Sequence, residues 1–303
     1  LKHASNVSGC GLAIAGVLEE AGAPDGVFQT LLLPGERVGE VLEHPAVVAA
    51  TLTGSEAAGR AIAARSGGLL KKTVLELGGS DPYLVLEDAD LDLAAATCAD
   101  SRLINSGQSC IAAKRFIVHE AVYEDWLNRF TAAMAAVRMG DPSDEATDLG
   151  PMARHDLRDD LHRQVTESVA AGATLRLGGE IPPGPGAFYP PTVLTGVGPG
   201  MPAYDEELFG PVAAVITVGD EDEAVRVAND TPFGLGAAVF TTDLERGRRI
   251  AAERLEAGTC VVNTLVASDP RLPFGGIKAS GYGRELSDLG IREFVNQKTV
   301  IVD

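Results

Sequence analysis

Strand-like and helix-like segments alternate through the first eighty residues of the chain. Apolar residues recur at helical spacing from Val7 to Glu20, and a glycine and a proline then follow, which end helices. The later segments continue the alternation, with strands expected at 28–33, 47–53 and 72–77 and helices at 36–43 and 54–65. Strands that alternate with helices are joined by right-handed crossovers and form a parallel sheet. The sequence therefore predicts an α/β fold.

Composition excludes several classes of partner. A chain of 303 residues can bury a large core and is long enough for two domains. No apolar run reaches the roughly 18 residues of a membrane-spanning helix. The net charge of −18 disfavours nucleic acid, because a phosphate backbone requires a basic face. We therefore expect neither a nucleic-acid partner nor a membrane partner.

The cysteines and histidines are too scattered for a disulfide framework or a zinc site. The four cysteines include no Cys-x-x-Cys pair, and no two of the five histidines have the spacing of zinc ligands. We therefore expect no metal, and free thiols favour a reducing compartment, here the cytoplasm. The abundance of alanine, glycine and arginine is typical of a bacterium with a GC-rich genome.

Cys110 lies on a connection that can present a reactive side chain. A helix is expected from Asp90 to Ile104, followed by the turn residues Asn-Ser-Gly, and a strand is expected at 115–118. A thiol on such a connection becomes a nucleophile when its proton is removed, because the thiolate is the reactive form. The alternative is a small buried apolar residue, a common role of free cysteine.

Glu76 lies at the carboxyl end of the strand expected at 72–77 and precedes the flexible pair Gly78-Gly79. Open α/β sheets bind ligands at the carboxyl ends of their strands. A carboxylate at that edge can act as a general base, although it can also serve only to cap the next segment.

A glycine-rich turn from Gly54 to Gly59 joins an expected strand to an expected helix. Unpaired N–H groups and the positive helix end meet at such a turn, which suits a phosphate. The Gly-x-x-x-x-Gly spacing differs from the usual dinucleotide fingerprint, and close packing of two glycines is the alternative. Lys2 and Ser5, at the head of the first helix, are placed to reach a ribose or its 2′-phosphate, although a lone lysine is more often only solvated.

Six motifs occur in the order and at the spacings of the aldehyde dehydrogenase superfamily, and the chain resembles that superfamily along its whole length. These motifs are Lys2, the turn of Gly54, Ser55 and Gly59, Leu75-Glu76-Leu77-Gly78-Gly79, Gly107-Gln108-Ser109-Cys110, Glu206-Glu207-Leu208-Phe209-Gly210-Pro211, and the closing segment from Asn263 to Glu285. The resemblance implies two parallel-sheet α/β domains, the first of them incomplete, and a C-terminal oligomerisation strand. It places a partial dinucleotide-binding domain at 1–78, a catalytic domain at 79–278, and the closing segment with its strand at 279–303.

The resemblance also implies the chemistry. The Cys110 thiolate attacks an aldehyde, hydride passes to a nicotinamide, and Glu76 activates the water that hydrolyses the resulting thioester. Glu207 would hold the nicotinamide ribose, and Phe209 would pack on the ring. The cofactor-binding residues that the resemblance implies are Lys2, Ser5, Gly54, Ser55, Gly59, Leu77, Glu207 and Phe209.

Two stretches, 2–7 and 266–273, resemble the succinate-semialdehyde dehydrogenases of bacteria. In that subgroup Ser268 would bind the distal carboxylate of the substrate. Ser5 stands where many NAD-dependent members carry a glutamate, which would repel a 2′-phosphate that Lys2 can neutralise. NADP is therefore the expected cofactor, with NAD as the alternative. Ile104 stands where animal-type enzymes carry a carboxylate-binding arginine, so an upstream arginine or Arg102 would have to replace it.

The same resemblance predicts that an amino-terminal region is missing. The family's oxyanion-stabilising asparagine precedes the cofactor lysine and would lie before Leu1. Because losing one oxyanion donor lowers turnover by roughly 10²–10³, we expect the 303-residue chain to be weakly active or inactive.

Residues 293–302 alternate like an exposed edge strand, which in the family joins a neighbouring subunit, so a homodimer or homotetramer is expected for the complete protein. Two other functions remain open. One is a cysteine acyltransferase or hydrolase with His119 as its base, and the other is a non-catalytic protein on the same scaffold.

Overall fold

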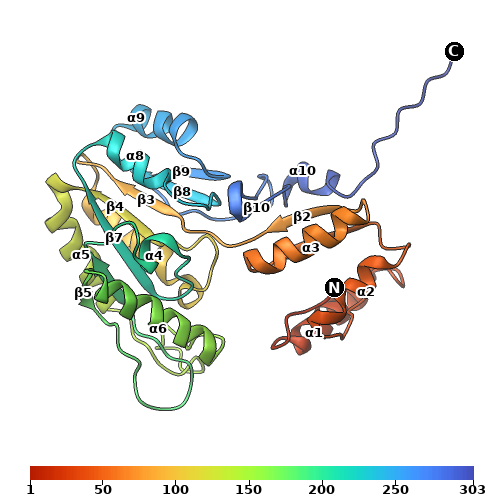
Figure 1. Cartoon of the computed structure of the whole chain (residues 1–303), viewed down its shortest axis with the longest axis horizontal. Coiled ribbons are helices and arrows are strands. Elements are labelled where there is room, and N and C mark those ends of the chain that lie inside the picture. The colour runs from red at the N-terminus through yellow and green to blue at the C-terminus, as the bar shows by residue number, and fades with distance from the viewer. The chain divides into compact units, whose positions relative to one another are not determined.

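The computed structural model describes all 303 residues, which divide into two compact units (Figure 1). Unit 1 comprises Leu1–Thr51 and Arg60–Thr73, and unit 2 comprises Leu52–Gly59 and Val74–Asp303. The three elements that begin in one unit and end in the other are β1 (Ala49–Thr53), α3 (Glu56–Gly68) and β2 (Lys72–Glu76).

Unit 1 also contains α1 (Ser8–Glu20), the 3₁₀ helix η1 (Gly35–Arg37) and α2 (Val38–Glu43). The strand expected at 28–33 is not formed, and that prediction was wrong. Leu1 N donates to Gln29 O at 2.6 Å and Leu31 N donates to Leu1 O at 2.8 Å, but the next backbone bond, from Leu33 N to Leu31 O, is local. Alternating apolar residues form a strand only where a neighbouring strand continues the ladder.

Unit 2 is built on a seven-stranded sheet with the order β5-β6-β7-β4-β3-β8-β9. All neighbouring strands are parallel except β5 and β6, so the predicted parallel α/β fold is confirmed. The strands are β3 (Pro82–Val85), β4 (Arg115–His119), β5 (Thr174–Leu177), β6 (Thr192–Thr195), β7 (Val212–Val218), β8 (Gly236–Phe240) and β9 (Thr259–Val262).

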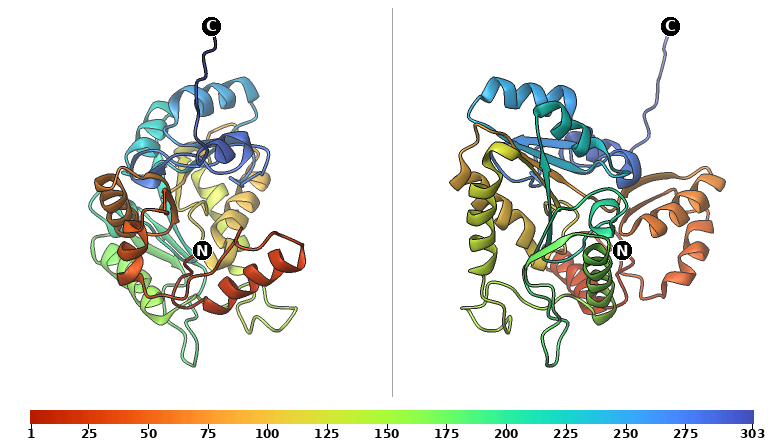
Figure 2. Two further views of the ribbon diagram at one scale, coloured as in Figure 1. Left: turned by 90° about the vertical axis from the view of Figure 1, so that its right-hand side faces the viewer. Right: turned by 60° about the vertical axis from the view of Figure 1, so that its left-hand side comes forward.

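Helices lie on both faces of this sheet (Figure 2). One face is covered by α4 (Leu91–Leu103) and α5 (Tyr123–Ala135), and the other mainly by α6 (His155–Ala170) and α8 (Glu221–Asn229). The remaining elements are η2 (Ile104–Gly107), η3 (Glu120–Val122), α7 (Pro202–Asp205), α9 (Leu244–Arg249), the π-helical turn η4 (Ile250–Arg254), η5 (Lys278–Ser280), β10 (Gly281–Tyr282) and α10 (Ser287–Arg292).

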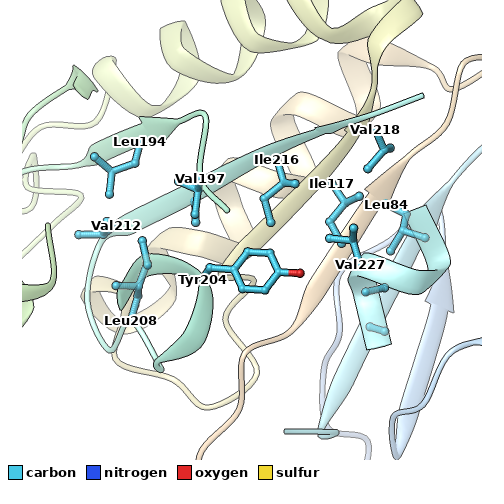
Figure 3. Close-up of a cluster of buried hydrophobic side chains, with 14 of the residues drawn as sticks. Leu84, Ile117, Leu194, Val197, Tyr204, Leu208, Val212, Ile216, Val218 and Val227 are labelled. Atoms are coloured by element: carbon cyan, nitrogen blue, oxygen red, sulfur yellow. The ribbon is translucent and has the colours of Figure 1, made fainter. Parts of the chain in front are cut away.

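The core follows the alternation of the strands, because successive side chains point to opposite faces. Tyr83 and Val85 of β3 pack with the α4 and α5 side, whereas Leu84 packs on the opposite side. Figure 3 shows this second core, in which the ring of Tyr204 lies among aliphatic side chains from the sheet and from α8. The sheet is thus a rigid platform with apolar contacts on both faces.

The carboxyl end of β2 belongs to a second sheet in unit 2. β10 pairs antiparallel with β2, with Gly281 opposite Glu76 and Tyr282 opposite Leu75. Residues 77–81 then lead directly into β3 of the large sheet. The connection after Glu76 therefore joins the carboxyl end of one strand to the amino end of another.

Two further expectations differ from the structure. The apolar spacing at 120–139 predicts one long amphipathic helix, but α5 ends at Ala135. Arg138 N donates to Asp148 Oδ2 at 2.9 Å, and the chain turns into a loop there. The edge strand expected at 293–302 is not formed within this chain, where no neighbouring strand pairs with it. Instead the last residues run outward as an extended tail (Figures 1 and 2). No helix combines the length and apolar character needed to cross a bilayer.

Candidate active site

The turn before Cys110 has a conformation that few residues tolerate. The φ angles of Asn105, Ser106 and Gly107 are +51°, +57° and +74°, in the left-handed region that favours glycine and asparagine. A Cβ on Gly107 would lie 2.2 Å from the carbonyl carbon of Gly210. The turn therefore packs directly on the backbone that follows Phe209, and only glycine fits at its third position.

We expect Gly107→Ala to lower the free energy of unfolding by about 2–4 kcal/mol, because the new methyl group would meet backbone at a strained φ. Denaturant unfolding measures the change. Gly198→Ala is the matched control, since a Cβ there meets nothing within 4 Å. Equal stability of the two variants would contradict the backbone contact.

Arg102, at the end of α4, holds the same turn. It is fully buried and donates to Gly107 O at 2.6 Å, to Val212 O at 3.3 Å and to Leu208 O at 3.4 Å. Burial lowers its pKa to about 9. Because the guanidinium is inaccessible and bonded to main chain, the suggestion that Arg102 binds a substrate carboxylate was wrong.

Glu76 is a buried carboxyl group without a hydrogen-bond partner. Its exposed fraction is 2%, and neither Oε1 nor Oε2 forms a hydrogen bond. Burial raises its pKa to about 8, with the negative charge of Glu285 adding to the shift and Arg284 opposing it. Glu76 is thus mainly protonated at neutral pH and gains its charge as the pH rises through about 8.

The segments that carry Glu76 and Cys110 meet at Gly79. A Cβ on Gly79 would lie 2.7 Å from Cys110 O, and Gly79 N donates to Glu207 Oε1 at 2.9 Å. The two side chains do not hydrogen-bond to each other. Gly79 therefore brings the Glu76 connection, the cysteine segment and Glu207 together.

Cys110 is a partly exposed free thiol. Burial raises its pKa, Asp81 and Glu207 raise it further, and the positive charge of Lys114 lowers it. The thiol form therefore prevails at neutral pH, and a nucleophilic role requires a proton acceptor.

The structure brings some of the predicted cofactor residues together. Gly54 N donates to Glu76 O at 3.0 Å, and Ser55 Oγ accepts from Ala58 N at 3.3 Å at the start of α3. A Cβ on Gly59 would lie 2.5 Å from the Leu77 methyl groups. Close packing therefore explains Gly59 without a ligand.

The other predicted residues lie on three separate segments of the chain. Lys2 and Ser5 belong to unit 1, ahead of α1. Phe209 lies in the segment that contacts the cysteine turn, and 37% of it is exposed. Ser268 is exposed in the connection that follows β9.

Sequence reasoning missed three buried polar residues around this site, Asp81, Lys114 and Ser280. Ser280 Oγ donates to Gly78 O at 2.7 Å and so holds the Glu76 connection, and Asp81 Oδ1 accepts from Gly236 N at 3.0 Å. A charged side chain directly before an apolar strand, such as Lys114 before β4, could have indicated a buried polar residue.

Comparisons with known proteins identify the family of the chain. The chain matches the model of the aldehyde dehydrogenase family over residues 1–300. It is 53% identical over 300 residues to a probable NADP⁺-dependent succinate-semialdehyde dehydrogenase of Synechocystis sp., covering 99% of this chain and 66% of that protein. It is 52% identical to the NADP⁺-dependent succinate-semialdehyde dehydrogenase of Mycobacterium avium, covering 99% of this chain and 63% of that protein.

Solved structures are similar as well. The succinic semialdehyde dehydrogenase of Streptococcus pyogenes in complex with NADP⁺ has a TM-score of 0.97 at 40% identity and covers 100% of this chain and 66% of that one. An aldehyde dehydrogenase of Mycobacterium tuberculosis complexed with NAD⁺ has a TM-score of 0.96 at 35% identity. This match covers 100% of this chain and 63% of that one. The chain thus spans 63% to 66% of the length of these proteins. From its motifs, its fold and these matches, the chain belongs to the aldehyde dehydrogenase family.

Proposed function

We propose that this chain carries the nucleophile and the general base of an enzyme that oxidises succinate semialdehyde to succinate with NADP. The observation that carries the proposal is the meeting of the Cys110 segment and the Glu76 connection at Gly79, which supports a shared reaction site. The subgroup motifs, and relatives named as NADP⁺-dependent succinate-semialdehyde dehydrogenases, support the substrate and cofactor.

The proposed reaction assigns separate tasks to the two side chains. The Cys110 thiol gives its proton to a water molecule, and its sulfur attacks the aldehyde carbon. NADP, when bound, would supply the acceptor for the hydride that leaves this carbon. The acyl group is then left on Cys110 as a thioester. Glu76, once ionised, removes a proton from the water that hydrolyses this thioester. Its raised pKa suits this task, because a base with a pKa near the working pH is the most effective one.

The residues present fit NADP in two respects. The amino-terminal end of α3 follows Gly54 directly, and the positive end of its helix dipole suits a phosphate. The partly exposed ring of Phe209 lies in the segment that contacts the cysteine turn, where it can cover a nicotinamide.

The substrate is tested by comparing aldehydes with and without a distal carboxylate. The chain is assayed as it stands and after extension to the length of its relatives, called the extended protein below. We expect kcat/KM with succinate semialdehyde to exceed that with butanal by at least about 10²-fold, measured by NADPH absorbance. Equal values would contradict the substrate assignment.

Ser5→Glu tests the cofactor preference. A carboxylate beside the 2′-phosphate should weaken NADP binding at least about tenfold through repulsion between like charges, while NAD binding changes little. Fluorescence titration of the extended protein with both cofactors measures this, and Ser8→Glu, also exposed, is the control. Equal weakening of NADP and NAD would remove Ser5 from the cofactor site.

A cysteine hydrolase that uses His119 is disfavoured by position. Cys110 precedes β4, whereas His119 is its last residue, so the strand separates them by about 13 Å at about 3.3 Å per residue. His119 Nδ1 also accepts from Ala121 N at 3.2 Å and caps η3. Thioester hydrolysis by this protein that is independent of nicotinamide would favour that alternative.

The C-terminal tail supports an oligomer. Val300, Ile301 and Val302 are 71%, 83% and 87% exposed, and an unpaired apolar strand-like segment favours pairing with another chain. We infer that the tail contacts a second copy of the protein. Light scattering should report a dimer or tetramer of the extended protein and a smaller species after removal of residues 298–303. An unchanged mass would contradict the inference.

A further inference from the structure

Lys114 is a buried cation to which the proposed reaction assigns no task. It is fully buried in unit 2, at the residue before β4. Its Nζ donates to the main-chain carbonyls of Ser109 at 3.1 Å, Cys110 at 2.9 Å and Ala112 at 3.1 Å. An ammonium group has three N–H donors. All three donors are therefore used on the segment that carries Cys110.

Two carboxylates and one guanidinium act on this ammonium group. Glu207 is in ion-pair range, with Oε1 3.6 Å from Nζ, and Asp81 adds a second negative charge, while Arg102 contributes a positive one. Burial lowers the pKa of Lys114, and the charges of Glu207 and Asp81 oppose that shift. A buried charge is retained where opposite charges and hydrogen bonds compensate its lost hydration.

These contacts form a closed ring around Cys110. Lys114 binds the Cys110 carbonyl and pairs with Glu207, Glu207 accepts from Gly79 N, and Gly79 lies against the Cys110 carbonyl. Any change at Lys114 is therefore transmitted both to the cysteine backbone and to the connection that follows Glu76.

The charge of Lys114 also has a defined effect on the thiol. Of the three charged side chains that act on Cys110, Asp81 and Glu207 raise its pKa and Lys114 lowers it. An opposite charge within about 4–6 Å typically lowers the pKa of an acid by about 1–3 units. Removing this charge leaves burial and two carboxylates, which oppose ionisation of the thiol, and the backbone N–H of Ile111, which favours it.

We propose that Lys114 is a positioning residue for the nucleophile: it fixes the carbonyls of the cysteine segment and supplies the positive charge that favours the Cys110 thiolate. This role rests on the proposed function of Cys110. A purely structural role is the competing explanation, and it predicts a loss of stability without a change in the acidity of the thiol.

Alkylation of Cys110 by iodoacetamide across the alkaline pH range, followed by mass spectrometry of its peptide, measures the acidity without aldehyde or cofactor. Lys114→Gln keeps an amide donor and removes the charge, whereas Lys114→Arg keeps the charge. We expect Lys114→Gln to raise the alkylation midpoint by about one pH unit or more, so that Cys110 reacts about tenfold more slowly below it. The midpoint of Lys114→Arg should stay near that of the unmodified protein.

A folded Lys114→Gln protein with an unchanged midpoint would overturn the proposal, and so would equal shifts in the Gln and Arg variants. If Lys114→Gln does not fold, Glu207→Gln provides the second measurement. Removal of the carboxylate that pairs with Lys114 should lower the midpoint, and an unchanged value would refute the electrostatic role. The midpoint does not depend on turnover, so failure of aldehyde oxidation would refute the proposed function and still leave the role of Lys114 to be decided.

Discussion

Replacing Cys110 by serine is expected to reduce NADPH formation from succinate semialdehyde by at least about 10³-fold. A hydroxyl group is far less acidic than a thiol, and His119, the base that a hydrolase would use, is the last residue of β4 and caps η3. The only positive side chain that lowers the pKa of Cys110, Lys114, is already engaged with three carbonyls. The variant should keep its fold, since sulfur and oxygen differ little in size.

Initial rates of the extended protein measure the loss. Cys10→Ser is the matched control, because Cys10 is an exposed free thiol on α1 and should leave the rate near that of the unmodified protein. Circular dichroism shows whether both variants are folded. A folded Cys110→Ser enzyme that retained a tenth of the rate would exclude the thiol as the nucleophile.

Glu76→Gln is expected to separate the two halves of the reaction. The first turnover still releases one equivalent of NADPH, because acyl transfer to Cys110 does not consume the activated water. Later turnovers then slow by about 10²–10⁴-fold, since the amide cannot accept a proton from water. Stopped-flow absorbance should therefore show a burst followed by a nearly flat line.

The same variant determines the pH dependence. Burial raises the pKa of Glu76 to about 8, so the carboxylate that a base requires appears as the pH rises through that value. The steady-state rate of the unmodified enzyme should rise with it, and the rise should be absent in Glu76→Gln. Glu285→Gln is the matched variant: it removes a charge that raises the pKa of Glu76, so the rise should move to lower pH. Identical pH profiles for all three proteins would show that Glu76 is not the base.

The surroundings of Cys110 could be predicted where they depend on local sequence. The helix expected at 90–104 is α4, capped by Asp90, and the strand expected at 115–118 is β4. Both are specified by neighbours in the chain, through the cap, the turn residues and the apolar run. The left-handed turn at Gly107 follows from the same local pattern.

Strand formation could not be predicted where it depends on a pairing partner that is distant in the sequence. Residues 28–33 have strand-like alternation, but outside this segment their backbone bonds only to Leu1, and the tail at 293–302 forms no strand in this chain. The four-residue strands β5 and β6 are too short to show alternation clearly, and each pairs with a neighbour in the sheet. Strand formation is decided by the neighbouring strand, which alternation within one segment does not reveal.

The position of the candidate site relative to the strands could be predicted only in part from the sequence. Glu76 is the last residue of β2, at the carboxyl end where the rule for open sheets expects ligands to bind. Cys110, however, precedes β4, so the candidate site lies at the amino ends of β3 and β4 in the large sheet. The rule therefore holds for the sheet of β2 but not for the large sheet. Residues 77–81 connect the carboxyl end of β2 to the amino end of β3. The burial of Arg102 and Lys114 could not be predicted from the sequence. Both side chains donate to main-chain carbonyls, and a sequence motif does not identify such partners.

The most direct test of the central claim is the site of acylation. Glu76→Gln in the extended protein is mixed with succinate semialdehyde and NADP, quenched in acid, digested and analysed by mass spectrometry. We expect a succinyl group on the peptide that contains Cys110, removable by neutral hydroxylamine as a thioester should be. A burst of NADPH with no acyl group on that peptide, or with the acyl group on Cys260 instead, would contradict the account.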